Sequence, residues 1–500
     1  MESKINRITD ILRRDDGISG AMMYTEQISW ILFLKFINDL EINQDDEAEL
    51  DGLKYSYIIE EKYRWNIWAC PKIKDGKDKG KLDLRNALSG DDLLAFVNGE
   101  LFPYLKGFKS LTADVKSVKY KIGAIFEFLD NRIANGHTLR EVLDIIDDMN
   151  FHNQSDLFQL SLIYEKLLKD MGSDGGNAGE FYTPRPLIKT IVDVVNPTIG
   201  ERIYDPAVGS CGFLIEAYNH IRYKDISTNT QRELSTGELR FLSRETFFGN
   251  EKTPLSYVMG VMNMILHGVE APNIAKANTL TKDIRGLEEK DRYECILANP
   301  PFGGKEKEQI QQNFPIKSNA TELLFLQHIM NSLKLGGRCG VVIPEGVLFQ
   351  TNKAFKAVKK ELLERFNVHT ILSLPSGIFL PYSGVKTNVI FFDRKGATSD
   401  IFYYEVNLPQ KLTKNRPIKN EHFKEFLNIW SERKITDNSW IVNVNDIKDF
   451  DISAKNRNNI ETIEHKAPMD IVKSIKANDK QIDTIMSQIE AILQTKESAK

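Results

Sequence analysis

The stretch LANPPFGG, Leu297 to Gly304, contains residues that could hold an amine during group transfer. Two prolines after an asparagine cannot continue a helix and donate no hydrogen bonds to a sheet, so a strand should end here. The side-chain carbonyl of Asn299 and the backbone carbonyl of Pro300 could accept both hydrogens of an exocyclic amine, and so draw its lone pair out of conjugation. Pro301 adds no competing N–H group, and Phe302 could stack on a base rotated out of a duplex.

These features predict methyl transfer to the amine of an adenine by orientation and hydrogen bonding, with no metal required. The candidate catalytic residues are Asn299, Pro300, Pro301 and Phe302. The competing interpretation is a strand-to-loop stop with a buried phenylalanine.

A second group of residues could bind a cofactor. In YDPAVGSCGFLIEAY, residues 204–218, a strand should end at Asp205, and Gly209 and Gly212 bracket the start of a helix. Such a turn lets a ligand approach the backbone, although a structural turn between strand and helix would look alike. Glu251 ends the next strand, where a carboxylate can accept two O–H bonds from a ribose diol. Asn278, in the loop 275–283, could read an adenine amino group.

The pattern of the chain indicates what positions these residues. Residues of about 5–150 are mainly helical, with clear helices at 26–41 and 139–151. From about 155 to 395, strands alternate with helices, which favours an open, doubly wound parallel sheet with its ligands beyond the carboxyl ends of the strands. The expected strands are 202–206, 246–251, 293–300, 338–344, 368–375 and 387–394, and two of the expected helices are 322–334 and 356–366.

The motifs NPPF and DPAVGSCGF together resemble those of the N6-adenine DNA methyltransferases that use S-adenosylmethionine. With GEFYTPRPLI (179–188), YSGVKTNVIFF (382–392) and the helical N-terminal region, the chain resembles more specifically the modification (M, HsdM) subunit of type I restriction–modification systems. The resemblance covers nearly the whole chain. It implies an α/β, Rossmann-like methyltransferase domain with a helical N-terminal domain and a C-terminal helix.

The resemblance also implies roles for single residues. One segment would cover the methionine end of the cofactor, a second would form the glycine-rich cofactor loop, Glu251 would bind the ribose, and the NPPF residues would be catalytic. Many related enzymes have an aspartate where Asn278 stands, but the asparagine side-chain carbonyl can also accept a hydrogen bond from the cofactor's adenine amine. The cofactor-covering segment is Glu180, Phe181, Tyr182, Thr183, Pro184 and Arg185, and the loop residues are Asp205, Ser210, Cys211 and Gly212.

We expect three regions: a helical N-terminal domain over 1–150, a catalytic domain over 151–400, and a C-terminal region over 401–500 with a partner-binding helix at about 468–495. That last helix carries an apolar stripe at alternating spacings of four and three, with a single asparagine, which is typical of a partner contact. A helix docked on its own domain is the alternative. The stripe is Ile471, Ile475, Asn478, Ile482, Ile485, Ile489 and Ile492.

After residue 395 no region resembles a DNA-recognition domain, and the net charge is −4. Sequence specificity is therefore expected on another polypeptide. The resemblance implies the same arrangement: two M subunits with one specificity (S) subunit on double-stranded DNA, in some systems with a restriction (R) subunit.

Composition sets outer bounds. The 500 residues are 41% hydrophobic and 27% charged, enough for a large core. No leading segment resembles a signal peptide, and the weakly polar stretch 257–269 is too short to span a bilayer, so no membrane association is expected. The four cysteines are scattered without a CxxC pair, which predicts a reduced, cytoplasmic protein without a zinc site.

Three other functions remain open from the sequence. The chain could be a stand-alone adenine methyltransferase with specificity in its own tail. It could methylate glutamine side chains of proteins, although that family generally has tyrosine where Phe302 stands. It could also be a cofactor-binding scaffold without catalysis, which the intact NPPF residues oppose.

Overall fold

The computed structural model describes residues 2–73, 75, 77, 79–115, 117–149, 151, 167, 183–225, 230–380, 382–453, 469, 476 and 478–487. Three residues of the predicted cofactor-covering segment, Glu180, Phe181 and Tyr182, lie outside this set. The chain divides into two units, Met1–Ala454 and Lys455–Lys500. Within the described ranges, no helix has the length and apolar character needed to cross a membrane.

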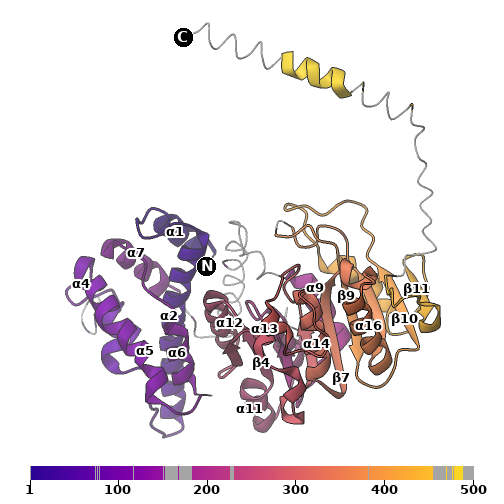
Figure 1. The fold of residues 1–500 in the computed structure, drawn as a ribbon. Coiled ribbons are helices and arrows are strands. Elements are labelled where there is room, and N and C mark those ends of the chain that lie inside the picture. Colours follow the sequence, from indigo (N-terminus) through magenta and orange to yellow (C-terminus); the bar gives the residue numbers. More distant parts are fainter. Residues whose placement is uncertain are drawn as a thin grey trace. The chain divides into compact units, whose positions relative to one another are not determined.

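The N-terminal part of the first unit is helical, as predicted, and its helices form a group of their own (indigo and purple in Figure 1). The expected helices at 26–41 and 139–151 lie within or overlap α2 and α7. Most of α2 between Ala21 and Glu41 is buried, which explains why its apolar residues show no single helical stripe. The helices are α1 (Glu2–Leu12), α2 (Ala21–Leu50), α3 (Trp65–Trp68), α4 (Gly90–Phe96), α5 (Phe102–Leu111), α6 (Val118–Phe126) and α7 (Gly136–Asp147).

A nine-stranded sheet follows, in the order β11-β10-β8-β9-β7-β6-β1-β4-β5. All six expected strands are present, and three further strands extend the sheet at its edges. The strands are β1 (Ile203–Asp205), β4 (Phe247–Glu251), β5 (Asn273–Lys276), β6 (Tyr293–Ala298), β7 (Leu333–Pro344), β8 (Asn367–Ser373), β9 (Thr387–Asp393), β10 (Asp400–Glu405) and β11 (Ser439–Asn443). A separate small sheet pairs β2 (Tyr223–Asp225) with β3 (Thr230–Gln231).

The sheet is mixed, which corrects the expectation of a parallel sheet throughout. β5, β4, β1, β6 and β7 pair in parallel, but β9 is antiparallel to both β7 and β8, and β11 is antiparallel to β10. The physical reason is the connection. Among the described residues 374–380 and 382–386 no helix joins β8 to β9, and a strand that returns through a loop pairs in the antiparallel direction.

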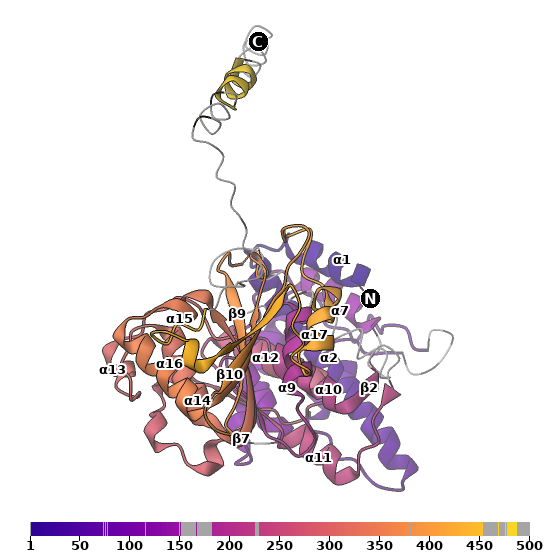
Figure 2. The same cartoon turned by 90° about the vertical axis from the view of Figure 1, so that its right-hand side faces the viewer.

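Helices cover both faces of the sheet (Figure 2). α14 and α16 pack with Ile296 and Ala298 on one face, and α9, α10 and α12 pack with Cys295 and Leu297 on the other. This alternation along β6 is what a strand buried on both sides requires. The helices of this region are α9 (Arg185–Val195), α10 (Gly212–Arg222), α11 (Thr236–Arg244), α12 (Pro254–Leu266), α13 (Glu308–Gln311), α14 (Thr321–Ser332), α15 (Glu345–Phe349), α16 (Lys353–Arg365) and α17 (Lys424–Ile429).

The second unit is described at 469, 476 and 478–487, and residues 478–487 are helical. Ile482 and Ile485 of the predicted stripe are 56% and 54% exposed. The other isoleucines of the stripe lie outside the described residues.

Candidate active site

The strand order brings the separate motifs to one edge of the sheet. β1 lies between β6 and β4, and all three run in parallel, so their carboxyl ends meet there. Asp205 ends β1, Glu251 ends β4, and Asn299 follows β6. Residues nearly a hundred positions apart thus form one candidate site, as expected for a sheet of this kind.

The glycine-rich loop is a tight turn held by α12. Gly209 and Cys211 have φ angles of +49° and +63°, in the left-handed region that favours glycine. A Cβ atom on Gly260 of α12 would lie 2.7 Å from the Gly209 carbonyl oxygen, so only glycine permits this approach. Asn263 Nδ2, one turn along α12, donates to Ser210 O at 2.9 Å. The loop conformation is therefore set by a helix distant in sequence.

Two carboxylates lie buried beside this loop. Asp205 is 1% exposed and accepts a hydrogen bond from Ala207 N at 2.9 Å. Glu251 is 7% exposed; its Oε2 accepts from Gly209 N at 3.0 Å, and its Oε1 accepts from Thr253 N and Oγ1. Burial, partly offset by the Ala207 N–H and reinforced by the Glu251 charge, raises the pKa of Asp205 to about 8. Within the described part of the chain, no lysine or arginine forms an ion pair with either carboxylate. A cationic ligand would complement this site.

Replacing Asp205 with asparagine should stabilise the ligand-free protein, by about 4 kcal/mol at pH 7. Because the pKa of Asp205 is raised in the folded state, the carboxyl does not destabilise the folded protein below about pH 4, where it is protonated in both states. The free energy of unfolding then falls as the pH rises from about 4 to about 8. The Tm difference between D205N and wild type should therefore be small at pH 4 and largest at pH 8. Thermal melting across this range measures it.

Asp193 provides a control of opposite sign. Burial raises its pKa, but hydrogen bonds with His220 and Lys189 outweigh that effect and leave the pKa lowered. D193N should therefore lose stability at neutral pH relative to wild type. A D205N protein that melts below wild type at pH 8 would contradict the proposed burial penalty.

Asn299 is held by one end of its side chain. Its Nδ2 donates to Thr183 Oγ1 at 2.9 Å, while its Oδ1 is buried and has no hydrogen-bond partner among the described residues. A buried acceptor without a donor is unfavourable unless a ligand satisfies it. Phe302, partly buried, packs edge-on against Phe379 with ring centroids 5.7 Å apart. The arrangement presents one carbonyl oxygen, without a donor among the described residues, beside an aromatic pair.

The described part of the predicted cofactor-covering segment joins the two halves of the site. Thr183 accepts from Asn299, Pro184 precedes the first turn of α9, and Arg185 Nη1 donates to Gly212 O at 3.1 Å. The segment therefore contacts both the NPPF turn and the start of α10. Asn278 lies at the end of the strand after β4, but its Oδ1 accepts from Leu280 N and caps the short helix η4 (Thr279–Thr281).

Several residues of the site were not found from the sequence. Gly260 and Asn263 support the glycine-rich loop, Phe379 packs on Phe302, and Asn250 joins neighbouring loops. Gly260 and Asn263 stand within an apolar helix whose pattern indicates only burial. Asn250 directly precedes Glu251, and this position beside a predicted cofactor residue was the local signal that could have pointed to it.

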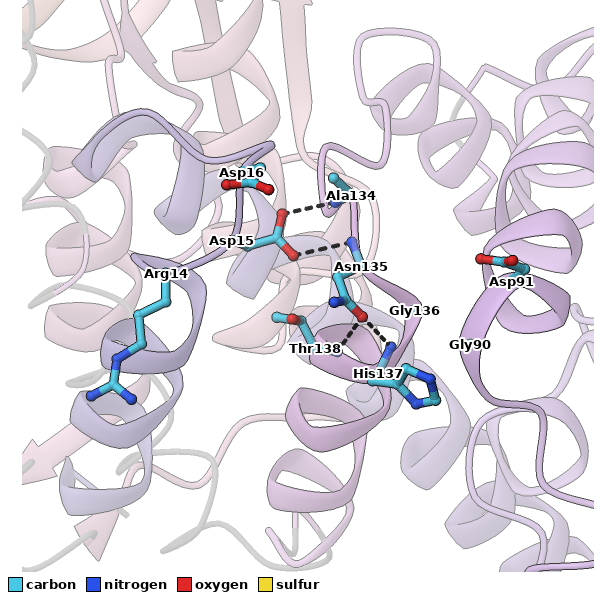
Figure 3. Close-up of a pocket in the computed structure, with 10 residues that line it drawn as sticks. All are labelled: Arg14, Asp15, Asp16, Gly90, Asp91, Ala134, Asn135, Gly136, His137 and Thr138. Carbon is cyan, nitrogen blue, oxygen red and sulfur yellow. Dashed lines mark hydrogen bonds between the residues drawn. The ribbon is translucent and has the colours of Figure 1, made fainter.

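The N-terminal helices contain a cavity of about 380 Å³ at the start of α7 (Figure 3). Asp15 accepts from the backbone N–H groups of Gly17, Ala134 and Asn135, and Asn135 Oδ1 caps α7 through His137 N and Thr138 N. These polar groups serve the local backbone. The cavity is therefore a structural junction and does not share residues with the candidate site.

Comparison with known proteins identifies the family. The N-6 DNA Methylase model matches residues 153–467, and the HsdM N-terminal domain model matches residues 1–146. The EcoEI type I restriction enzyme methylase subunit of Escherichia coli is 34% identical over 99% of this chain and 97% of its own length. The EcoKI methylase subunit of E. coli K12 is 30% identical over 91% of this chain and 81% of its own length.

Solved structures agree. A modification subunit assigned to a type I restriction enzyme of Vibrio vulnificus YJ016 matches with a TM-score of 0.81 and 35% identity, over 93% of this chain and 99% of that one. A second match is a chain from a structural study of complex assembly and conformational transition in a type I R-M system. Its TM-score is 0.75 and its identity 41%, and the match covers 99% of this chain and 98% of that one. The chain therefore belongs to the N-6 DNA methylase family of adenine-specific DNA methyltransferases and, within it, to the methylase subunits of type I restriction enzymes.

Proposed function

We propose that this methylase subunit transfers a methyl group from S-adenosylmethionine to the N6 amine of an adenine rotated out of double-stranded DNA, at sites chosen by a separate S subunit. The observation that carries the chemical part is the buried Asn299 Oδ1, which has no donor among the described residues. An adenine amine would supply that donor. The Pro300 carbonyl would take its second hydrogen, and Phe302 would lie against the base.

The catalytic contribution of these residues is orientation. The amine lone pair is delocalised, and two fixed acceptors favour the geometry in which it points out of the ring plane. As positive charge develops on the nitrogen, both hydrogen bonds strengthen because the acceptors carry partial negative charge. Thr183 holds the Asn299 amide group so that its oxygen is presented and its nitrogen is not.

The residues around the glycine-rich loop suit S-adenosylmethionine. When bound, that cofactor supplies a methyl group activated on a cationic sulfonium. Asp205 and Glu251 are buried carboxylates without an ion pair from the described residues, so they would interact favourably with a cationic ligand. Glu251 engages three donors, which leaves lone-pair capacity for a ribose hydroxyl. We assign the cofactor to Asp205, Ser210, Cys211, Gly212 and Glu251, with the segment 180–185 and Asn278 at its two ends.

Replacing Glu251 with alanine should weaken S-adenosylmethionine binding by about 10- to 100-fold, because hydrogen bonds to a charged group are lost and Gly209 N loses its acceptor. Equilibrium binding of labelled S-adenosylmethionine measures the effect. Glu270→Ala is the matched control, since Glu270 is a half-exposed carboxylate that pairs with Arg244 on the same domain. Equal Kd values for the two variants would contradict the assignment.

The partner part of the proposal rests on the relatives of the chain and on its C-terminal isoleucines. One similar solved chain comes from a structure of type I R-M system complex assembly, and the described isoleucines of the stripe, Ile482 and Ile485, are exposed. We infer an assembly of two such subunits with one S subunit, joined in some systems by an R subunit.

Methylation by the purified chain, with and without its S subunit, tests this function. The expected result is N6-methyladenine at a split recognition site, found by single-molecule sequencing, only when both subunits are present. Methylation of a defined site by the chain alone would instead support a stand-alone enzyme. No N6-methyladenine with both subunits, or methylated glutamine in a protein substrate, would overturn the proposal.

A further inference from the structure

A buried polar network joins the carboxyl end of β1 and its following loop, the carboxyl end of β4, and the loop that follows β5. Thr279 Oγ1 donates to Pro206 O at 2.5 Å and accepts from Asn250 Nδ2 at 3.2 Å. The same Nδ2 donates to the Tyr204 hydroxyl at 2.9 Å. The backbone carbonyl of Asn250 accepts a hydrogen bond from Val208 N at 3.1 Å. Each of these loops carries a residue assigned above to the cofactor: Asp205, Glu251 or Asn278.

Atom types fix the direction of the bonds made by Asn250 and Thr279. Asn250 Nδ2 is a donor and gives its two hydrogens to the Tyr204 and Thr279 hydroxyl oxygens. Thr279 uses its single proton toward Pro206 O, which leaves its oxygen free to accept from Asn250. The Tyr204 hydroxyl also lies 3.0 Å from Nε2 of the buried His328 ring, which the Ser332 hydroxyl approaches at 3.3 Å. Because these bonds cross between neighbouring segments, displacing one segment breaks its bonds to the others.

The turn at Asn278 is held to its neighbours by a backbone bond and by the Thr279 side chain. Ala277 N donates to the backbone carbonyl of Glu251 at 2.8 Å. The side-chain oxygen of Asn278 accepts from Leu280 N within the same turn. The neighbouring Thr279, 4% exposed, uses its hydroxyl to bond Pro206 O after β1 and Asn250 Nδ2 of β4. The Thr279 hydroxyl therefore links this turn directly to the segment that follows Asp205.

We propose that Thr279 and Asn250 are positioning residues that set the spacing of the three loops and thereby the affinity for S-adenosylmethionine, without acting on the rate of methyl transfer. This inference rests on the proposed function. It assigns a role to two further residues. Their described side-chain hydrogen bonds do not involve the NPPF turn, and neither residue contacts the proposed reacting atoms.

The test replaces the Thr279 hydroxyl with a methyl group of the same shape. Thr279→Val should raise the Kd for S-adenosylmethionine about tenfold, while kcat at saturating cofactor changes less than about threefold. Thr279→Ser keeps the hydroxyl and should restore the Kd to within about twofold of wild type. Both are measured in the full chain, with binding followed by equilibrium dialysis and turnover followed in the complex with the S subunit.

Thr246→Val is the matched control. Thr246 is also buried, and its hydroxyl donates to the backbone oxygen of Phe241 at 3.2 Å. It precedes the amino end of β4, whereas the candidate site lies at the carboxyl ends of the strands. T246V should lower the Tm without changing the Kd.

Equal changes in Kd for T279V and T246V would show a general structural effect and overturn the inference. So would an unchanged Kd for T279V, or a fall in kcat as large as the rise in Kd. Wild-type binding of S-adenosylmethionine separates these failures from failure of the proposed function, because a wild-type chain that does not bind the cofactor would refute the function itself.

Discussion

Replacing Asn299 with alanine is expected to lower the rate of methyl transfer by about 10²- to 10³-fold, the usual effect of removing one positioned hydrogen bond at a reacting centre. The variant deletes the buried oxygen that has no donor among the described residues. The described hydrogen bonds of Asp205 and Glu251 do not involve Asn299, so both carboxylates keep them in the variant and S-adenosylmethionine binding should stay near the wild-type value. Single-turnover methylation and equilibrium cofactor binding give the two readouts.

Two further variants sharpen this experiment. Asn331→Ala removes an amide from α14 whose described hydrogen bond stays within its own helix, to Gln327 O, and should leave both readouts unchanged. Thr183→Val keeps the Asn299 oxygen but removes the acceptor that orients its amide, so its loss of rate should be smaller than that of N299A. Near wild-type turnover by N299A would exclude the proposed role of the NPPF turn.

Removing the residues after position 465 should abolish co-purification with the S subunit and leave cofactor binding intact. The reason is the apolar stripe: exposed isoleucines at heptad spacing are stabilised when a partner helix covers them. The residues assigned to the cofactor all lie in Met1–Ala454, a separate unit from Lys455–Lys500. Affinity capture of a tagged S subunit measures complex formation.

The C-terminal helix also allows a control without truncation. The double variant Ile482→Asp and Ile485→Asp places two charges on the stripe, whereas Gln481→Asp and Thr484→Asp places the same charges at the same spacing on an adjacent face. Only the first pair should disrupt the complex. Unchanged capture of the truncated chain, or equal loss with both pairs, would refute a partner contact through the stripe.

The sequence predicted the elements of the catalytic region because their signals are local. An apolar run ended by a polar residue indicates a strand, and this signal depends only on residues that are close together in the sequence. The strands that end at Asp205, Glu251 and next to Asn299 were identified in this way. The prediction for NPPF also came from residue types alone, since an amide oxygen and a proline carbonyl are acceptors in any fold.

The tertiary structure decided how these pieces meet. Strand order puts β1 between β6 and β4, and the antiparallel β9 is inserted between β7 and β8; neither follows from local spacing. The bond from Asn299 to Thr183 and that from Asn250 to Thr279 join residues 116 and 29 positions apart. The raised pKa of Asp205 depends on burial, which the surrounding elements create together.

The sequence by itself therefore predicted the candidate reacting groups and determined the strand ends that carry them, because both depend on residue type and short-range pattern. Only the tertiary structure decided that Asn299 Oδ1 has no donor among the described residues, that Asp205 is buried, and that the Thr279 hydroxyl bonds to Pro206 O and Asn250. These properties depend on contacts between residues far apart in the chain, and no local pattern records such contacts.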